Sequence, residues 1–318
     1  MAKSAAVKPP KKPLKSRLWN QRYLFLLMLP AVVWVVFICY APMTGLYMAF
    51  TNNSPTTEGY FHDLLGAPSV GVDWFEYFFQ NDFVMIMRNT LATSLLTLLF
   101  SFPAPILIAI FLNEVRSMRM KKFVQTASYL PYFISWVIAA NIFLTFLSGD
   151  GVVNDILQFF HFTDEDILFF QKGPYFWWII AIANTWKVMG YNAIIYLAAI
   201  SGIDQEQYEA AEVDGANALK QWWYITIPQM TSCFAFLFIT SIINGLARFS
   251  DLFIIGGNTS AGRPGGTLQT ILMYIYQFSF ESPQYGIASA GAMILFVLTF
   301  VITLINLKMT GFFKKKEA

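Results

Sequence analysis

Residues 286–307 read GIASAGAMILFVLTFVITLINL, a stretch without a single charged side chain. A helix of this length, rising about 1.5 Å per residue, crosses the roughly 30 Å of hydrocarbon in a bilayer. Barrel strands are only about 10 residues long and alternate in polarity, so such runs favour helices. Five apolar runs stand out, and a sixth is apolar apart from a few polar residues: 24–50, 89–112, 129–147, 228–256 and 286–307, with 175–201 as the sixth. The sequence therefore predicts an all-α, polytopic membrane protein with six transmembrane helices.

The overall composition agrees with a membrane protein. Of the 318 residues, 56% are hydrophobic and only 13% are charged, against about 25% charged in a typical soluble domain. The first apolar run follows a basic flank, as in a signal peptide, but it is too long and no clean cleavage site follows it. It is therefore predicted to be retained. Cys39 and Cys233 fall in or beside apolar runs, which predicts small core hydrophobes rather than a disulfide or a metal site.

The distribution of Lys and Arg predicts the topology. Most of the 21 basic residues fall in the N-terminal tail, the 113–124 loop, the 202–227 loop and the C-terminal end. Because cytoplasmic segments carry an excess of Lys and Arg, both termini are predicted to be cytoplasmic. The expected organisation is a basic cytoplasmic tail at 1–22, a six-helix transmembrane domain at 23–308 and a second basic cytoplasmic tail at 309–318.

Prolines predict where the helices begin or bend. Pro103 and Pro105 interrupt the second apolar run and are expected to kink it. Pro131 is expected at the start of the third helix, where its missing N–H costs little. Pro228 is expected to open the fifth helix.

A polar segment, EAAEVDG at 209–215, lies between the fourth and fifth helices and is followed by ITIP at 225–228. Asp204 is the predicted N-cap, and Gln207 three residues later completes a capping-box pattern. Gly215 is placed to end the helix with a positive φ. The sequence thus predicts a capped cytoplasmic helix at about 205–217.

The residues of this helix suit a docking surface. Ala210 and Ala211 are small, so a partner can approach closely, while Glu209, Glu212 and Asp214 offer hydrogen-bond acceptors. An ordinary interfacial turn between two membrane helices explains the same residues without a partner.

The full pattern resembles the cytoplasmic coupling loop of ABC importer permeases: Glu-Ala-Ala, then Gly, then Ile-x-x-Pro. The likeness extends over roughly 20–308 and is strongest to the LplB-like carbohydrate permeases of type I importers. One departure is Gly256-Gly257-Asn258, where such permeases often have Gly-Gly-Pro. The matching motifs are Leu29-Pro30, Tyr40-Ala-Pro42-Met-x-Gly45, Asn89-Thr90, Phe102-Pro103-Ala-Pro105, Leu112-Asn113-Glu114, Gln125-x-x-x-Tyr129-Leu130-Pro131, Ser135-Trp136 and Tyr285-Gly286-x-Ala288.

The resemblance implies a non-catalytic, multi-pass permease subunit in a bacterial cell membrane. It implies a heterodimer with a second homologous permease, two cytoplasmic ATPase subunits, an extracellular lipid-anchored or soluble binding protein and a carbohydrate substrate. No nucleic-acid partner is implied. It also assigns ATPase docking to six positions: Glu209, Ala210, Ala211, Asp214, Gly215 and Pro228. The chain has no Gly-Lys-Ser/Thr of a phosphate-binding loop. No cofactor of its own is therefore expected, and ATP would be bound by partner subunits.

Polar residues within apolar runs are costly in a bilayer and are candidates for function. The fourth and fifth runs each carry a polar stripe on one face of a predicted helix, and the stripes overlap in depth as the walls of one cavity would. Their donors and aromatic faces suit a neutral polyhydroxyl ligand. The residues predicted to line this pathway are Asn184, Trp186, Lys187, Tyr191, Asn244, Arg248 and Asp251.

Other interpretations remain open at this point. Arg248 and Asp251 are spaced as an i,i+3 ion pair, and Asn244 could hydrogen-bond between helices, so the stripe could hold the bundle together. An ion-coupled secondary carrier could use Lys187, Arg248 or Asp251, but it predicts inverted repeats, and no convincing repeat relates the two halves. An ABC permease for a non-sugar solute would share the coupling motif. A membrane-embedded enzyme would need a polar catalytic cluster, and none is visible.

Overall fold

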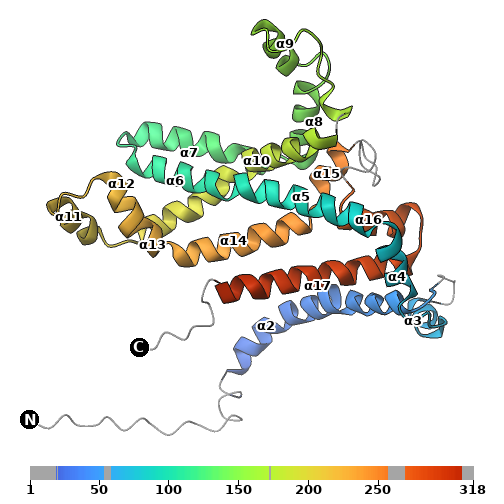
Figure 1. Cartoon of the computed structure of the whole chain (residues 1–318). Coiled ribbons are helices and arrows are strands. Elements are labelled where there is room, and N and C mark those ends of the chain that lie inside the picture. The colour runs from blue at the N-terminus through green and yellow to red at the C-terminus, as the bar shows by residue number, and fades with distance from the viewer. Residues whose placement is uncertain (1–18, 20, 54–58, 172, 257–268, 310–318) are drawn as a thin grey trace, which may run out of the picture. The chain divides into compact units, whose positions relative to one another are not determined.

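The computed structural model describes residues 19, 21–53, 59–171, 173–256 and 269–309 (Figure 1). The chain forms two compact units, Met1–Tyr47 and Met48–Ala318. Its described residues are almost entirely helical, and their extended pairing is limited to an isolated antiparallel bridge between Thr51 and Ser69. Most of the two predicted basic tails lies outside the described residues.

The first unit is built on one apolar helix. Helix α2 spans Arg22–Trp34 and continues through π-helical turns at Val35–Tyr40 into a tighter helical segment, Ala41–Phe50. Its side chains from Tyr23 to Tyr40 are exposed and mostly apolar, which is typical of a helix surrounded by lipid. Cys39 is among them, so its predicted place in a core is wrong. Cys233 of the second unit does pack against a buried cluster.

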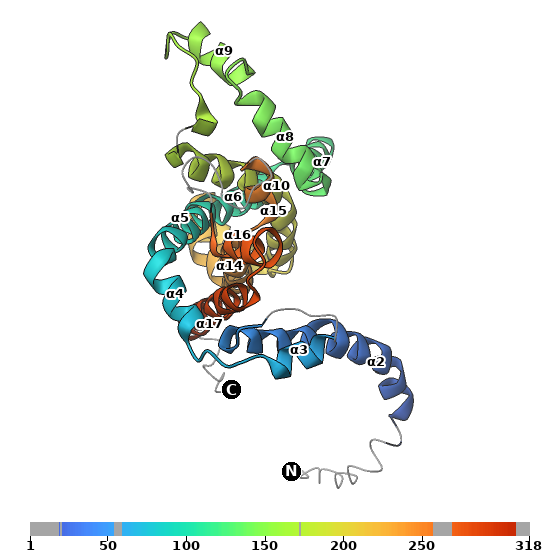
Figure 2. The same ribbon diagram turned by 90° about the vertical axis from the view of Figure 1, so that its right-hand side faces the viewer.

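The second unit is a bundle of long helices. These are α5 (Phe83–Ser101), α6 (Pro103–Glu114), α10 (Gly173–Ser201), α14 (Thr231–Leu246) and α17 (Tyr285–Met309). Helix α10 packs against α5 and α6, and α14 packs against α5 and α17, as two perpendicular views show (Figures 1 and 2).

Shorter helices connect the long ones and carry much of the polar chemistry. In chain order they are α3 (Tyr60–Gly66), α4 (Asp73–Asn81), α7 (Met118–Phe133), α8 (Trp136–Phe146), α9 (Val152–Phe159), α11 (Gln205–Val213), α12 (Ala218–Gln221), α13 (Ile227–Gln229), α15 (Ser250–Ile255) and α16 (Ile271–Tyr276).

Three described helical stretches are long and apolar enough to cross a membrane: Arg22–Phe50, Phe83–Glu114 and Tyr285–Met309. Two bent pairs raise the number to five if each pair is a single span. Helix α10 is 29 residues long, more than the roughly 20 that a span needs, but polar residues interrupt its apolar surface. The count of six spans stays a prediction.

The third apolar run is not one helix beginning at Pro131. Helix α7 begins much earlier, where the Ser117 side chain caps it by accepting a hydrogen bond from the Met120 N–H. Pro131 lies near the end of α7, and α8 starts at Trp136 after a bend of 101°. The predicted start was wrong because the first turns of α7 are polar and an apolar count overlooks them.

The fifth run is also broken, and the prediction of a single helix over 228–256 was wrong. Pro228 lies in the short α13, not at the start of the long helix, and α14 leaves the preceding segment at 68°. Helix α14 ends at Leu246 and α15 begins at Ser250, so Arg248 lies in a non-helical break. At Pro103 the predicted interruption is confirmed, since α5 ends at Ser101 and α6 starts at the proline.

Candidate functional site

A polar cavity of about 540 Å³ lies within the second unit, between α5, α7, α8, α10, α14 and α15. Polar and aromatic side chains make up most of its wall. The residues that line it are Thr97, Ser101, Tyr132, Trp136, Asn184, Val188, Tyr191, Asn192, Ile195, Phe236, Leu237, Thr240, Ser241, Asn244, Ala247, Arg248, Phe249, Ser250 and Asp251.

Five of the seven residues predicted to line a pathway lie on this cavity: Asn184, Tyr191, Asn244, Arg248 and Asp251. The two predicted stripes therefore do meet, although helix five is broken between Asn244 and Arg248. The other two residues, Trp186 and Lys187, are not part of the wall. Trp186 packs edge-on against Phe143 at 5.7 Å between ring centroids.

Lys187 lies behind the wall, almost fully buried. Its ammonium donates to the backbone carbonyl oxygens of Pro131 and Tyr132, each at 3.1 Å, and also to that of Ile134. The ammonium therefore binds the end of α7 rather than the cavity.

Arg248 and Asp251 form a buried ion pair, with Nη1 and Oδ2 2.5 Å apart. The predicted pair thus exists, and both partners also line the cavity, so the two interpretations of these residues are compatible. The Asn244 side chain makes no hydrogen bond to another residue that the structure describes, so the interhelical hydrogen bond is not seen. The Nε of Arg248 is buried without a partner among the described atoms.

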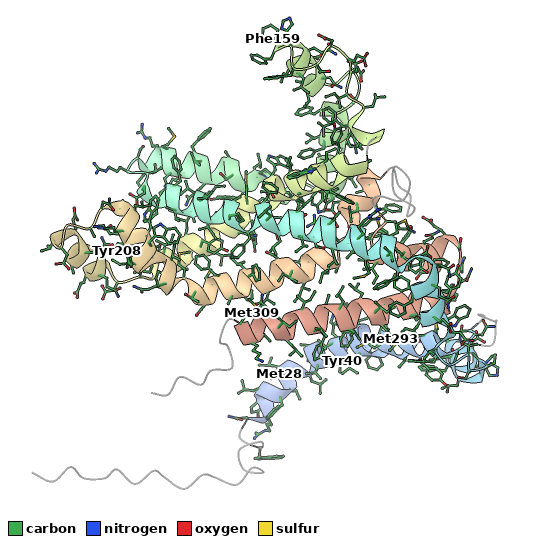
Figure 3. All side chains as sticks on the ribbon, viewed as in Figure 1. Met28, Tyr40, Phe159, Tyr208, Met293 and Met309 are labelled. Carbon is green, nitrogen blue, oxygen red and sulfur yellow. The ribbon has the colours of Figure 1, made fainter. Side chains whose placement is uncertain are left out.

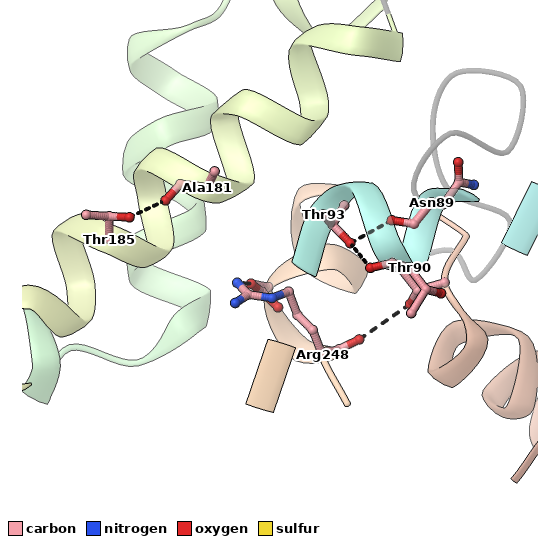
Figure 4. A network of polar contacts seen from close by, with 8 residues as sticks. Asn89, Thr90, Thr93, Ala181, Thr185 and Arg248 are labelled. Atoms are coloured by element: carbon pink, nitrogen blue, oxygen red, sulfur yellow. Dashed lines mark hydrogen bonds and ion pairs between the residues drawn. The ribbon is translucent and has the colours of Figure 1, made fainter. Parts of the chain in front are cut away.

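A polar network supports the break that carries Arg248 (Figure 4). The Thr270 hydroxyl approaches the Arg248 carbonyl oxygen at 3.5 Å, and the next residue, Ile271, donates its N–H to Thr90 Oγ1 at 3.0 Å. The Asn89 amide donates to the Gln269 carbonyl oxygen at 3.1 Å. The start of α5 thereby satisfies backbone groups next to α16, which buried backbone requires.

Several residues of the cavity wall were not predicted from the sequence. Thr97 and Ser101 lie one turn apart on α5, and Thr93 continues the same buried stripe. Spacing of four residues on a helix was a signal that could have revealed them. Tyr132 and Trp136 had no such signal, because the bend between α7 and α8 brings them to the cavity. Tyr132 stacks on Tyr191 with ring centroids 4.0 Å apart and planes 5° from parallel.

The predicted capped helix is α11, Gln205–Val213. Asp204 caps it as predicted, accepting a hydrogen bond from the Glu206 N–H. The capping box is wrong, because the Gln207 side chain instead accepts a hydrogen bond from the Gln229 amide. Gly215 has a φ of +77°, and the Gly215 and Ala216 N–H groups bond back to the carbonyls of Glu212 and Ala211. This is a Schellman motif, which requires the left-handed residue that glycine supplies.

Helix α11 is anchored on one side and open on the other. The Tyr208 hydroxyl lies 2.8 Å from Thr226 Oγ1 (Tyr208 is labelled in Figure 3). In the segment that follows α11, the Trp222 indole donates to the Glu114 carboxylate of α6 at 3.2 Å. Outward, Val213 is 88% exposed. Among the predicted docking residues, Ala211 is half-buried, and the remaining five are exposed: Glu209, Ala210, Asp214, Gly215 and Pro228. The open side of α11 thus presents an apolar side chain, Val213, between the acidic Glu212 and Asp214.

Apolar helices of membrane-spanning length, a polar cavity among them and an exposed, capped helix beyond them define a membrane permease. Residues 101–309 match the family described as the binding-protein-dependent transport system inner membrane component, and the chain belongs to this family. It is accordingly the non-catalytic permease subunit of an ATP-driven importer.

Relatives with similar sequences cover most of the chain. It is 39% identical to the protein LplB of Bacillus subtilis over 225 residues. This match covers 70% of this chain and 69% of LplB. It is 34% identical to the polygalacturonan/rhamnogalacturonan transport permease YteP of the same organism, over 89% of this chain and 86% of YteP. A solved bacterial alginate ABC transporter, in complex with an alginate pentasaccharide-bound periplasmic protein, has a chain that is 33% identical, with a TM-score of 0.79. That match covers 96% of this chain and 99% of the solved one.

Proposed function

We propose that this permease carries a neutral oligosaccharide, delivered by an extracellular binding protein, across the bacterial cell membrane into the cytoplasm. The charge of the cavity wall is the observation that carries the proposal. Among the described residues, Arg248 and Asp251 are the charged ones that line the cavity, and at 2.5 Å they neutralise each other. A polyanion would gain little from this ion pair, because the Arg248 guanidinium already has Asp251 as its anionic partner.

The remaining wall suits a sugar. Asn184 and Asn244 offer amide donors and acceptors to hydroxyl groups, and the stacked rings of Tyr132 and Tyr191 provide an aromatic surface. The names of YteP and of the alginate transporter concern acidic polysaccharides, which supports a carbohydrate substrate. The balanced charges of the lining residues favour a neutral sugar over such polymers. In this proposal the sugar contacts Asn184, Tyr191, Asn244, Arg248 and Asp251, while Trp186 and Lys187 support the wall from behind.

The open face of α11 is the proposed docking site for a cytoplasmic ATPase. Its anchored face ties α11 to the segment that precedes α14, through Tyr208–Thr226 and through the hydrogen bond from Gln229 to Gln207. A displacement of α11 by a partner would therefore be passed to the helices that line the cavity. The residues proposed to meet the ATPase are Glu209, Ala210, Ala211, Asp214, Gly215 and Pro228.

The proposed assembly contains a second homologous permease, two ATPase subunits and the binding protein. Both termini are proposed to be cytoplasmic, with basic tails at 1–22 and 309–318 flanking a six-helix domain at 23–308. The positive-inside distribution of Lys and Arg supports this topology.

An ion-coupled carrier is a weaker candidate. Proton coupling needs a titratable group that can bind and release a proton, and the candidates for it are Lys187, Arg248 and Asp251. Asp251 is held by Arg248, and the Lys187 ammonium is held by three carbonyls. The three intramembrane charges that such a carrier would use are therefore already engaged.

Transport by the reconstituted complex tests the proposal. The permease pair, its ATPases and the binding protein are placed in liposomes, and uptake of labelled maltotriose, arabinotriose and trigalacturonate is measured separately. ATP-dependent uptake of a neutral trisaccharide is expected. Uptake of trigalacturonate alone would contradict the neutral substrate, and uptake driven by an ion gradient without ATP would favour the carrier.

A further inference from the structure

The environment of Lys187 is unusual for a buried cation. An ammonium has three N–H donors, and here all three have carbonyl acceptors: Pro131, Tyr132 and Ile134. No carboxylate pairs with it in the part of the chain that the structure describes. The last carbonyls of a helix have no partner within the helix and carry the negative end of its dipole. Lys187 therefore acts as the C-terminal cap of α7, supplied from α10.

The cap stands at the sharper of the two bends that break apolar helical stretches in the part of the chain that the structure describes. Ile134 and Ser135 are extended between α7 and α8, and the two helices meet at 101°. The carbonyls that Lys187 binds lie on both sides of the last residue of α7, Phe133. The Pro131 carbonyl also accepts the Ile134 N–H at 3.2 Å, whereas the ammonium is the donor that the structure gives to the Tyr132 and Ile134 carbonyls. Loss of the ammonium would therefore remove hydrogen bonds from both sides of the bend.

A second contact holds α10 against α7 close to the cap. A Cβ on Gly190 would lie 2.1 Å from the carbonyl oxygen of Ser128, so only glycine permits this approach. Lys187 and Gly190 are three residues apart and therefore lie on the same face of α10.

The capped bend carries the aromatic wall of the cavity. Tyr132 and Trp136 both line the cavity, and their ring centroids lie 6.0 and 5.5 Å from the Lys187 ammonium, within the range of cation–π attraction. Tyr132 also stacks on Tyr191, one turn beyond Lys187 on α10. The ammonium thus contacts the rear of the same wall whose front faces the cavity.

We propose that Lys187 is a positioning residue: its ammonium holds the α7–α8 bend and thereby places Tyr132 and Trp136 for sugar binding. The part that concerns sugar rests on the proposed function, whereas the role at the bend does not.

The bend is tested by the distance between spin labels on α7 and α8 in the assembled transporter, held in phosphatidylcholine nanodiscs. Labels are placed at the exposed Phe123→Cys and Asn141→Cys after Cys39→Ser and Cys233→Ala. A narrow distance distribution is expected for the labelled protein that keeps Lys187. Lys187→Met should shift this distribution by several Å or at least double its width. Lys187→Arg, which keeps the charge, should restore it, and Thr185→Val on the same helix should leave it unchanged. An unaltered distribution in Lys187→Met would overturn the proposal; if that variant does not assemble, Lys187→Gln is measured with the same two outcomes.

The role in the wall is tested by non-additivity. Uptake of maltotriose, arabinotriose and trigalacturonate is measured for Lys187→Met, Tyr132→Ala and the double variant. Lys187→Met should raise the KM for uptake about tenfold, while the rate of ATP hydrolysis without sugar should stay within twofold of that of the unchanged protein. In the Tyr132→Ala background, the same substitution should raise KM less than twofold further. If the two substitutions raise KM by independent factors that multiply in the double variant, Lys187 does not act through the Tyr132 ring. If none of the three sugars is transported, the proposed function fails, while the distance measurement still decides the role at the bend.

Discussion

Two buried cations, Arg248 and Lys187, are compensated by different kinds of partner. Both lie in segments predicted to cross the membrane, where an uncompensated charge is costly. Arg248 lies in a helix break, pairs with Asp251 and lines the cavity. Lys187 lies inside a continuous helix, binds three carbonyl oxygens and contacts the rear of the cavity wall.

The difference follows from the chemistry of the two groups. A guanidinium is planar and pairs well with a carboxylate, whereas an ammonium is a compact group whose three donors suit converging carbonyls. A buried cation in a permease is therefore not by itself evidence of substrate contact. Its partners decide whether it belongs to the pathway or to the frame around it.

Removing Asp251 should have the largest effect. Asp251→Ala would leave the buried Arg248 charge unpaired and should destabilise the protein by about 3–5 kcal/mol. The amount of folded permease and its thermal midpoint in detergent would measure the loss. Replacing both partners, as in Arg248→Met with Asp251→Leu, should recover most of the stability. If the single variant were as stable as the double one, the pair would contribute little.

Removing the other cation should cost less. Lys187→Met leaves neutral carbonyls rather than a charge without a partner, so we expect a loss of about 2–3 kcal/mol, smaller than for Asp251→Ala. The same thermal measurement compares the two variants directly. A larger loss for Lys187→Met would reverse the comparison and show that the α7 cap is the more critical of the two sites.

The close approach beside Lys187 can be tested separately from its charge. Gly190→Ala would place a methyl group against the Ser128 backbone, which cannot give way as a side chain could. We expect a loss of about 1–3 kcal/mol from the forced separation of α10 and α7. Gly202→Ala, whose new Cβ would meet backbone atoms no closer than 3.4 Å, is the matched control. Equal stability of the two variants would show that the helices can separate freely.

The smallest effect on stability is expected at the far end of the unit, at Gly215. A Cβ there would meet nothing within 4 Å, so only the φ of +77° opposes a side chain. Gly215→Val should cost about 1 kcal/mol, yet it should weaken capture of the ATPase at matched membrane levels. Gly215→Asn, which tolerates a positive φ, should retain most of the capture. Unchanged ATPase recovery with Gly215→Val would mean that α11 ends in an ordinary interfacial turn.

Local patterns accounted for what the sequence could predict of the candidate site. Asp204 caps α11 and Gly215 ends it, as interactions within a few residues dictate. The capping box failed because Gln207 has a partner 22 residues away, Gln229. The prediction of a single fifth helix was wrong because apolar residues continue through the break at Arg248. The number of consecutive apolar residues does not reveal such a break.

The sequence by itself determined that this is a helical membrane protein with a capped polar helix beyond its apolar runs. Long uncharged runs and helix caps act through the residues next to them, so they can be recognised without knowing the fold. The sequence also showed which polar residues interrupt the apolar runs, although not what those residues contact.

Only the tertiary structure decided which of those residues face the cavity. The carbonyls that bind Lys187 lie 53 to 56 residues away in sequence, at the bend between α7 and α8. Tyr132 and Trp136 reach the cavity only because of the same bend. A buried charge must find partners wherever the packed helices bring them, and that placement depends on contacts between distant segments.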